Sequence, residues 1–335
     1  MAQSHYLIHG SLGSPYTMKM RAVMRYRRLP HVWIRDGNSR LAGRTGLKVA
    51  VIPVIQYLDG SYHNDSTPMI DDLERLHPGE RSIVPDDPGD AFLAYLLEDF
   101  ADEWVTKAMF HYRWFRARDQ DQMGHWLGFD LYQGQGLAKI RAFAREFRDR
   151  QVGRLALVGC TEANQYLVEE TCRRTLAALE RHVTDSWFFF GSRPSRAEFG
   201  LYGQLSQFIV DPTPTDILRA TAPYTARWVM NMDDVGGIDG EWSVKPVSAS
   251  VEAMLQLTGE VYLPFLVANA QAYAQGAETM SFTALGETYS QGVFRYQVKC
   301  LETLRTAYAA LDEATRGRID PLLDRTGCLP FLCKA

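Results

Sequence analysis

The sequence has few cysteines, and their arrangement excludes two kinds of site. Its five cysteines are an odd number, and no two of them form a CxxC pair. A disulfide framework needs paired cysteines and a zinc cluster needs closely spaced ligands, so we expect neither. We expect reduced, mostly structural thiols and no bound metal.

Long apolar runs and a large excess of one charge are also lacking. No uninterrupted apolar stretch approaches the roughly 20 residues of a membrane helix, and the first residues, MAQSHYLIHG, lack the basic start of a signal peptide. The 36 basic residues nearly balance the 40 acidic ones, which leaves a formal net charge of −4. We therefore expect a cytoplasmic protein that binds small molecules, with no nucleic-acid or membrane partner.

The chain is long enough for about two domains. It has 335 residues, of which 46% are hydrophobic, and no internal repeat or low-complexity tract. The first eighty or so residues change their apolar period several times, whereas almost everything after Pro88 has helical spacing. The proline-rich segment at residues 83–90 is expected to link the two parts.

The sequence pattern of the first eighty or so residues predicts alternating strands and helices. Short apolar segments at residues 5–10 and 31–35 fit buried strands, and the segment between them has helical spacing. Together they predict a βαβ unit, followed by a loop at residues 37–46. A further strand around Pro53, a turn at Asp59 and Gly60, and a helix that begins near Ser66 complete this part.

Ser14 precedes Pro15 at the expected start of the first helix. Serine is a favourable N-cap and proline is tolerated in a first turn, which is sufficient reason for the pair. A helix N-terminus also stabilises negative charge, so the Ser14 hydroxyl could hold a thiolate. The two roles are compatible, and Ser11 in the same loop is the alternative hydroxyl.

Pro53 lies inside an apolar segment that otherwise fits a central strand. Proline cannot donate a ladder hydrogen bond, so something must compensate. One solution is a cis Ile52–Pro53 bond, which would leave the Ile52 backbone free to pair with an extended ligand.

Several motifs together resemble the glutathione transferase superfamily. SPYTMKMR follows the first strand, VIPV precedes a hairpin and NDSTPMIDDLE begins the next helix, in an order that matches across roughly residues 5–80. FFFGSRPSRAEFGLYGQL resembles a helix start in the superfamily's C-terminal domain, with Ser195 and Glu198 spaced as a capping box. The resemblance implies an α+β protein with a thioredoxin-like domain at residues 1–83 and an all-helical domain at residues 89–335.

The resemblance also implies a glutathione site. Ser14, or Ser11, would stabilise the glutathione thiolate, and Ile52 beside a cis Pro53 would align the peptide. Asp65 and Ser66 would meet the γ-glutamyl ammonium and α-carboxylate, although a helix cap explains this pair equally well. Many members carry lysine or glutamine one to three residues before the proline. Here those positions are Ala50, Val51 and Ile52, and Lys48 stands farther back.

The segment HYRWFRAR interleaves aromatic and cationic residues at the end of a long helix whose core stripe is Phe92, Leu96, Phe100 and Trp104. By the resemblance, this helix lines a pocket for a small hydrophobic electrophile. The expected pocket residues are Tyr16, Tyr112, Arg113 and Arg116. An aromatic core face with solvated arginines is the alternative.

An extension that most transferases lack begins at about residue 236. Its segment SFTALGETYSQGVF is broken by glycine and is compatible with a flap or hairpin. It could cover the pocket, enlarge the helical bundle or contact a second subunit of the homodimer that the resemblance implies. Two functions remain open: a glutathione transferase, or a non-catalytic binding or scaffold protein of the same fold.

Overall fold

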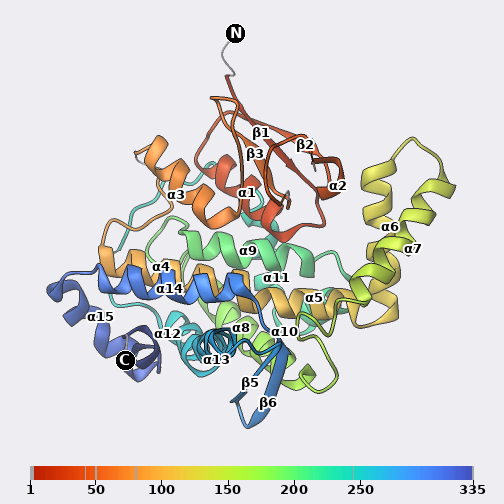
Figure 1. The fold of residues 1–335 in the computed structure, drawn as a ribbon. Helices are drawn as coiled ribbons and strands as arrows, with labels where there is room; N and C mark the ends of the chain where they lie inside the picture. Colours follow the sequence, from red (N-terminus) through yellow and green to blue (C-terminus); the bar gives the residue numbers. More distant parts are fainter. Residues whose placement is uncertain (1–3, 42, 50, 80, 244, 334–335) are drawn as a thin grey trace.

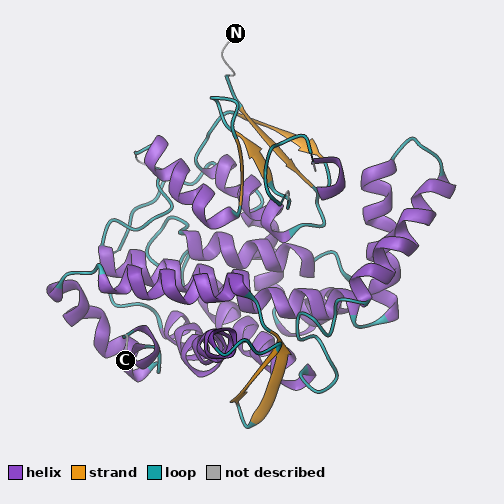
Figure 2. Cartoon of the chain, in the orientation of Figure 1, coloured by secondary structure: helices purple, strands orange, loops and turns teal. Residues whose placement is uncertain are grey.

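The computed structural model describes residues 4–41, 43–49, 51–79, 81–243 and 245–333. Near the N-terminus, a four-stranded sheet and its helices sit on top of a larger helical body (Figure 1). A second, two-stranded sheet lies at the opposite end of the molecule (Figure 2).

The first domain contains the elements that the sequence predicts, in the predicted order. The strands are ordered β2-β1-β3-β4, with β1 parallel to β2 and antiparallel to β3, and with β4 antiparallel to β3. The segment expected to be a loop contains a short helix, α2. The elements are β1 (Tyr6–Gly10), α1 (Pro15–Tyr26), β2 (His31–Arg35), α2 (Asn38–Leu41), β3 (Val54–Gln56), β4 (Tyr62–Asn64) and α3 (Ser66–Leu76).

The start and the packing of α1 follow from its cap and from one glycine on a neighbouring helix. Ser14 is the N-cap of α1 and Pro15 is its first residue. The helix packs on α9 (Arg196–Phe208), where a Cβ on Gly203 would lie only 2.8 Å from the Pro15 carbonyl oxygen. Glycine therefore permits the close approach that joins the two domains directly beneath the Ser14 loop.

The helical body begins with one long helix that changes its winding in the middle. The helix α4 (Pro88–Phe100) continues through a π-helical turn, η1 (Ala101–Val105), into α5 (Thr106–Trp114). The expected stripe on this helix is buried, because Phe92, Leu96, Phe100 and Trp104 are each at most 4% exposed. Periodicity did not predict the π turn.

A helical hairpin projects from this body beside the β2 edge of the sheet (Figure 1). It consists of α6 (Ala117–Tyr132) and α7 (Leu137–Val152). A Cβ on Gly128 would meet the Ile140 carbonyl oxygen at 2.6 Å, so glycine allows the two helices to pack closely. The remaining central helices are α8 (Gln165–Asp185), α9, α10 (Pro212–Thr221) and α11 (Pro223–Met232).

The extension packs against α4 and α8 and enlarges the bundle. Figure 1 shows α14 alongside α4, and the Tyr262 hydroxyl donates to Asp99 Oδ2 across 2.6 Å. The domain is not all-helical, since residues 279–292 form the hairpin that the sequence allowed. The elements are α12 (Ala249–Leu257), η2 (Thr258–Tyr262), α13 (Leu263–Ala274), β5 (Thr279–Ala284), β6 (Glu287–Gly292), α14 (Arg295–Ala309), α15 (Glu313–Arg325) and α16 (Leu329–Leu332).

One helical run in the extension has the length and composition of a membrane span. Residues 249–274 form a 26-residue helix that includes η2, and 61% of its most apolar window is buried inside the protein. Core helices of globular domains share this composition, so the run is accounted for by its packing.

Candidate functional site

Two cavities between the domains meet at Ile52 and Tyr16, which line both of them. We call the first, of about 390 Å³, the carboxylate cavity, and the second, of about 320 Å³, the serine cavity. Asp65 and Ser66 lie in the carboxylate cavity and Ser14 lies in the serine cavity. The structure thus brings most of the expected glutathione-site residues to one continuous groove.

Ser14 and Ser11 both line the serine cavity. Ser14 is 9% exposed, and its Oγ accepts a hydrogen bond from the Thr17 backbone N–H at 3.2 Å. The N-cap role is therefore present, while the hydroxyl proton of Ser14 remains available for a ligand. The Ser14 N–H donates to the Ser11 carbonyl oxygen, which ties the two serines into one turn.

Arg113 supports the serine loop and is not a free cation in the cavity. Its guanidinium donates to the Gly13 carbonyl oxygen at 2.7 Å, to Asp211 Oδ2 at 2.8 Å and to Gln207 Oε1 at 2.5 Å. The side chain is 3% exposed. Buried arginines with a carboxylate partner fix geometry, so Arg113 holds the loop that carries Ser14.

The Tyr16 hydroxyl forms a hydrogen bond within the protein and does not point to a thiolate ligand. It donates to the Asp102 carbonyl oxygen at 2.8 Å. Burial raises the pKa of Tyr16 well above its ordinary value, and the neighbouring Glu103 and Asp102 raise it further. Tyr16 is thus a neutral residue in the wall of both cavities. Ser14 and Ser11 remain the candidate hydroxyls for a hydrogen bond to a thiolate.

The Ile52–Pro53 bond is cis, as the resemblance implies. The Ile52 N–H, however, donates to Asn38 Oδ1 at 2.9 Å. A peptide ligand that pairs with the Ile52 N–H would therefore have to replace Asn38. Sequence reasoning missed this competing side chain because it lies 14 residues away, on α2.

Asp65 and Ser66 begin α3 at the far end of the groove. Asp65 is the N-cap residue with a φ of +76°, and its side chain makes no capping hydrogen bond. Its Oδ2 instead accepts a hydrogen bond of 2.9 Å from the Tyr296 hydroxyl, which comes from the extension. The Ser66 Oγ accepts from Lys19 Nζ at 3.3 Å. The cap interpretation of Asp65 therefore has no support from its side-chain contacts.

Three further carboxylates line the carboxylate cavity: Asp99, Asp102 and Glu103. Burial raises the pKa of Asp99 to about 7, that of Asp102 to about 6 and that of Glu103 to about 8, and repulsion from neighbouring carboxylates raises each of them further. At Asp102, the neighbouring Lys19 lowers the pKa and so opposes this increase.

Lys19 is fully buried beneath this cavity. Its Nζ lies 2.5 Å from both Glu98 Oε1 and Asp102 Oδ2. Burial lowers the pKa of Lys19, but the two carboxylates outweigh this effect and raise it overall. Lys19 therefore remains charged and joins α1 of the first domain to α4 of the second.

Apolar side chains from α5, α6 and α7 form the wall opposite Ser14. The serine cavity also has two arginines near its rim, Arg150 and Arg154. The wall can therefore accept a small apolar molecule beside the Ser14 hydroxyl. Its apolar residues are Met109, Phe110, Trp114, Leu127, Leu131, Phe143 and Phe147.

Three expected site residues lie outside the groove. Lys48 is exposed and lines neither cavity. Tyr112 packs its ring edge-on against Phe208 in the core, because it faces away from the serine cavity on α5. Arg116 pairs with Glu169 at 2.7 Å and lies over the Tyr112 ring. The position of Ala50 before Pro53 lies outside the described residues.

Sequence reasoning missed the acidic residues of η1 and Tyr296. The acidic residues lie in EDFADEWV, within the helix whose apolar stripe was recognised, and their charge did not single them out from a solvated helix face. No sequence pattern marks Tyr296 as a site residue, since only the tertiary fold places it beside Asp65. Among the described residues, no cluster of His, Cys, Asp and Glu has the arrangement of a metal site.

A thioredoxin-like domain joined to a helical bundle, with a groove between a helix N-terminal serine and a cis-proline segment, defines a glutathione-transferase fold. Family models for the glutathione S-transferase N-terminal domain and C-terminal domain match residues 8–81 and 136–229. Together they span half of the chain. The chain belongs to the glutathione S-transferase superfamily.

Solved structures with a similar fold share little sequence with the chain. The β-etherase LigF from Sphingobium sp. strain SYK-6 is 12% identical, with a TM-score of 0.47 over 75% of this chain and 98% of that one. A glutathione S-transferase from Methylobacterium radiotolerans JCM 2831, in complex with glutathione sulfonate, is 16% identical, with a TM-score of 0.42 over 73% and 98%. A tau-class transferase from mango (Mangifera indica) is 18% identical, with a TM-score of 0.40 over 69% and 89%. No curated protein sequence is significantly similar to the chain.

Proposed function

We propose that the chain binds glutathione in the groove and stabilises its thiolate for attack on a small hydrophobic electrophile. One observation supports this most directly: Ile52 lines two adjoining cavities, one of which contains Asp65 and Ser66 and the other Ser14. In this arrangement, the γ-glutamyl end of glutathione lies against Asp65 and its sulfur lies near the Ser14 hydroxyl.

The energy needed at the sulfur is within reach of the groups at Ser14. A free thiol has a pKa near 8.5, and lowering it to about 6.5 takes roughly 2.7 kcal/mol. A hydrogen bond to a charged acceptor contributes about 1.5–3 kcal/mol and a helix N-terminus about 0.3–1 kcal/mol. The Ser14 hydroxyl and the start of α1 can together supply this amount.

The electrophile is proposed to bind in the serine cavity. Its wall is made of aromatic and aliphatic side chains from α5, α6 and α7. Such a wall favours an apolar molecule, and it places that molecule on the side of the groove where Ser14 lies.

A non-catalytic binding protein of the same fold is the second candidate, and one contact favours it. Asn38 occupies the Ile52 N–H that would otherwise pair with a peptide. Glutathione that binds without a lowered thiol pKa would match this alternative.

Thiol titration in the bound state tests the proposal. In the parent protein, the pKa of bound glutathione is expected well below 8.5, and Ser14→Ala raises it by about one to two units through loss of a charge-assisted hydrogen bond. Ser11→Ala is the matched control and has a smaller effect. Calorimetry with glutathione measures binding separately. A titration that Ser14→Ala leaves unchanged and Ser11→Ala shifts would reassign the hydroxyl.

Assembly and location are further proposals. We expect a two-fold homodimer, and light scattering that returns a 38.0 kDa species at micromolar concentration would contradict it. A cytoplasmic location is likewise our proposal, and fractionation of cells that express the chain tests it.

A further inference from the structure

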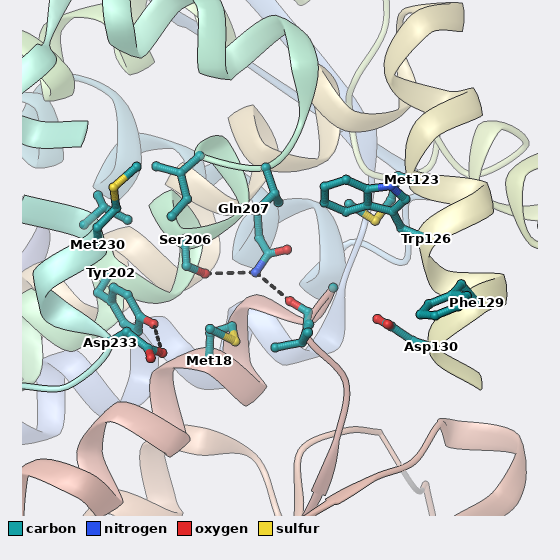
Figure 3. Close-up of a pocket in the computed structure, with 15 residues that line it drawn as sticks. Met18, Met123, Trp126, Phe129, Asp130, Tyr202, Ser206, Gln207, Met230 and Asp233 are labelled. Carbon is teal, nitrogen blue, oxygen red and sulfur yellow. Dashed lines mark hydrogen bonds between the residues drawn. The ribbon is translucent and has the colours of Figure 1, made fainter. Parts of the chain in front are cut away.

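A third cavity, of about 590 Å³, lies on the other side of the Leu12–Gly13 loop from the serine cavity. Figure 3 shows it between α6 on one side and α9 with α11 on the other, with Met18 of α1 beneath. We call it the methionine cavity. It is lined by Leu12, Gly13, Met18, Met123, Trp126, Phe129, Asp130, Tyr202, Ser206, Gln207, Ile209, Val210, Val229, Met230 and Asp233.

The polar groups at the α9 side of this cavity are engaged with the protein. The Tyr202 hydroxyl donates to Asp233 Oδ1 at 2.9 Å, and Arg25 pairs with Asp233 Oδ2 at 2.7 Å. The Gln207 amide donates to the Leu12 carbonyl oxygen at 3.1 Å, and Ser206 donates to Gly203. These groups close the wall and offer a ligand little polar recognition.

Asp130 differs from them. Figure 3 shows its carboxylate pointing from α6 toward the middle of the cavity, beside Phe129. Among the described residues, no side chain or backbone group donates a hydrogen bond to this carboxylate or forms an ion pair with it. Burial raises the pKa of Asp130, while the nearby Arg35, which itself donates to Gln133 Oε1, lowers it. The cavity thus has one unpaired anionic group.

The other walls suit an apolar cation. Trp126 and Phe129 are 49% and 48% exposed, so their rings remain uncovered by protein. Aromatic faces attract cations, and none of the lining residues is a lysine, arginine or histidine. Met18, Met123 and Met230 supply flexible thioether side chains that adapt to an apolar body.

We propose that the methionine cavity binds a small, largely apolar molecule that carries one positive charge, with the charge at Asp130 and the apolar body against the methionines. An anionic molecule would be repelled by Asp130, and no lysine, arginine or histidine lines the cavity to attract it. The Leu12–Gly13 loop separates this site from the glutathione groove, so the inference does not depend on the proposed function.

Three fluorescent probes of similar size and different charge test the proposal. They are 9-aminoacridine as the cation, N-phenyl-1-naphthylamine as the neutral molecule and 1-anilinonaphthalene-8-sulfonate as the anion. Titration of the full chain is expected to show at least about tenfold tighter binding of the cation than of the anion, a difference of 1.4 kcal/mol. Equal or tighter binding of the anion would overturn the proposal.

Asp130→Asn locates the charge. It is expected to weaken binding of 9-aminoacridine about threefold to fivefold, the order for one partly exposed ion pair, and to leave the neutral probe unchanged. Asp121→Asn is the matched control, because Asp121 lies exposed on the same helix and outside the cavity. Equal effects of the two substitutions would overturn the assignment of Asp130.

Competition separates this site from the glutathione groove. S-hexylglutathione is a probe for the groove and is expected to leave bound 9-aminoacridine in place. Displacement would place the cation in the serine cavity and overturn the inference. If S-hexylglutathione does not bind at all, the proposed function fails, while binding of 9-aminoacridine that depends on Asp130 still supports the methionine cavity.

Discussion

The two ends of the glutathione groove are built from different chemistry. The carboxylate cavity has Asp65, Asp99, Asp102 and Glu103 in its wall, above a buried lysine that pairs with one of them. The serine cavity offers hydroxyl groups and an apolar wall. One end is therefore suited to recognise a charged peptide terminus and the other to control a sulfur atom, and substitutions at the two ends should affect different measurements.

Loss of Lys19 should have the largest effect, on the stability of the carboxylate end. Lys19→Met leaves Asp102 without its cation in a buried setting, so the free energy of unfolding should fall by about 3–5 kcal/mol. Urea unfolding followed by tryptophan fluorescence measures this.

Lys107→Met is the matched control for Lys19. Lys107 is also buried, but it donates to the Val158 carbonyl oxygen and Gln291 Oε1, with no carboxylate among its hydrogen-bond partners. Burial lowers its pKa to about 8. A loss of stability as large as that in Lys19→Met would show that the ion pairs of Lys19 do not account for its effect.

Asp65→Asn should weaken ligand binding without changing the thiol. Asparagine tolerates a positive φ, so the start of α3 should persist. The affinity for S-methylglutathione, which has no titrating thiol, should fall about tenfold through loss of one charge-assisted hydrogen bond. Calorimetry measures it, with Asp86→Asn, which is exposed and outside both cavities, as the control.

The same variant sharpens the comparison of the two ends. The pKa of bound glutathione should remain that of the parent, because the proposed arrangement puts the sulfur at the serine end. A shifted thiol pKa in Asp65→Asn would mean that the two ends act together.

Glu103→Gln should change how stability depends on pH. Because the pKa of Glu103 is raised to about 8 in the folded protein, the folded state retains a proton that the unfolded chain releases above its ordinary pKa. The free energy of unfolding of the parent should therefore fall as the pH rises from about 4.5 to 8.

The substitution removes this contribution. Relative to the parent, Glu103→Gln should gain about 3 kcal/mol between pH 5 and pH 8, at about 1.36 kcal/mol for each pKa unit. Denaturation at the two pH values measures the gain, and Glu302→Gln, an exposed position on α14, should show none. A gain that is equal at both pH values would argue against a raised pKa at Glu103.

Tyr296→Phe should have the smallest effect. It removes the hydroxyl that donates to Asp65 and leaves the ring, so the affinity for S-methylglutathione should fall about threefold, as expected for one exposed hydrogen bond. Tyr273→Phe, on α13, is the control because Tyr273 is 44% exposed and lies outside both cavities. Unchanged or tighter binding in Tyr296→Phe would show that the extension does not help to position Asp65.

Many helix starts and buried faces in both domains could be predicted from local sequence. The Ser14–Pro15 start of α1, the capping box of Ser195 and Glu198, and the buried stripe through Trp104 depend on interactions within a few residues, and each is present in the structure. The cis bond before Pro53 also agrees with the resemblance. The short helix α2 and the π turn η1 were not predicted, because weak local preferences do not specify them.

The candidate site was predicted only in part. Ser14, Ile52 and Asp65 lie along the groove, but Tyr112 and Arg116 point elsewhere on α5 and after it. The face of a helix that turns toward a cavity depends on how the helix is rotated in the bundle. An aromatic and cationic segment does not determine that rotation.

The sequence by itself determined where helices and strands begin and which motifs belong to a glutathione transferase, since caps, turns and apolar periods act over a few residues. The tertiary structure alone decided which distant side chains meet. It placed Asn38 on the Ile52 N–H, Tyr296 on Asp65 and Lys19 between Glu98 and Asp102. These contacts join residues that are 14, 231 and about 80 positions apart in the sequence. They depend on the packing of whole domains, which local preferences do not specify.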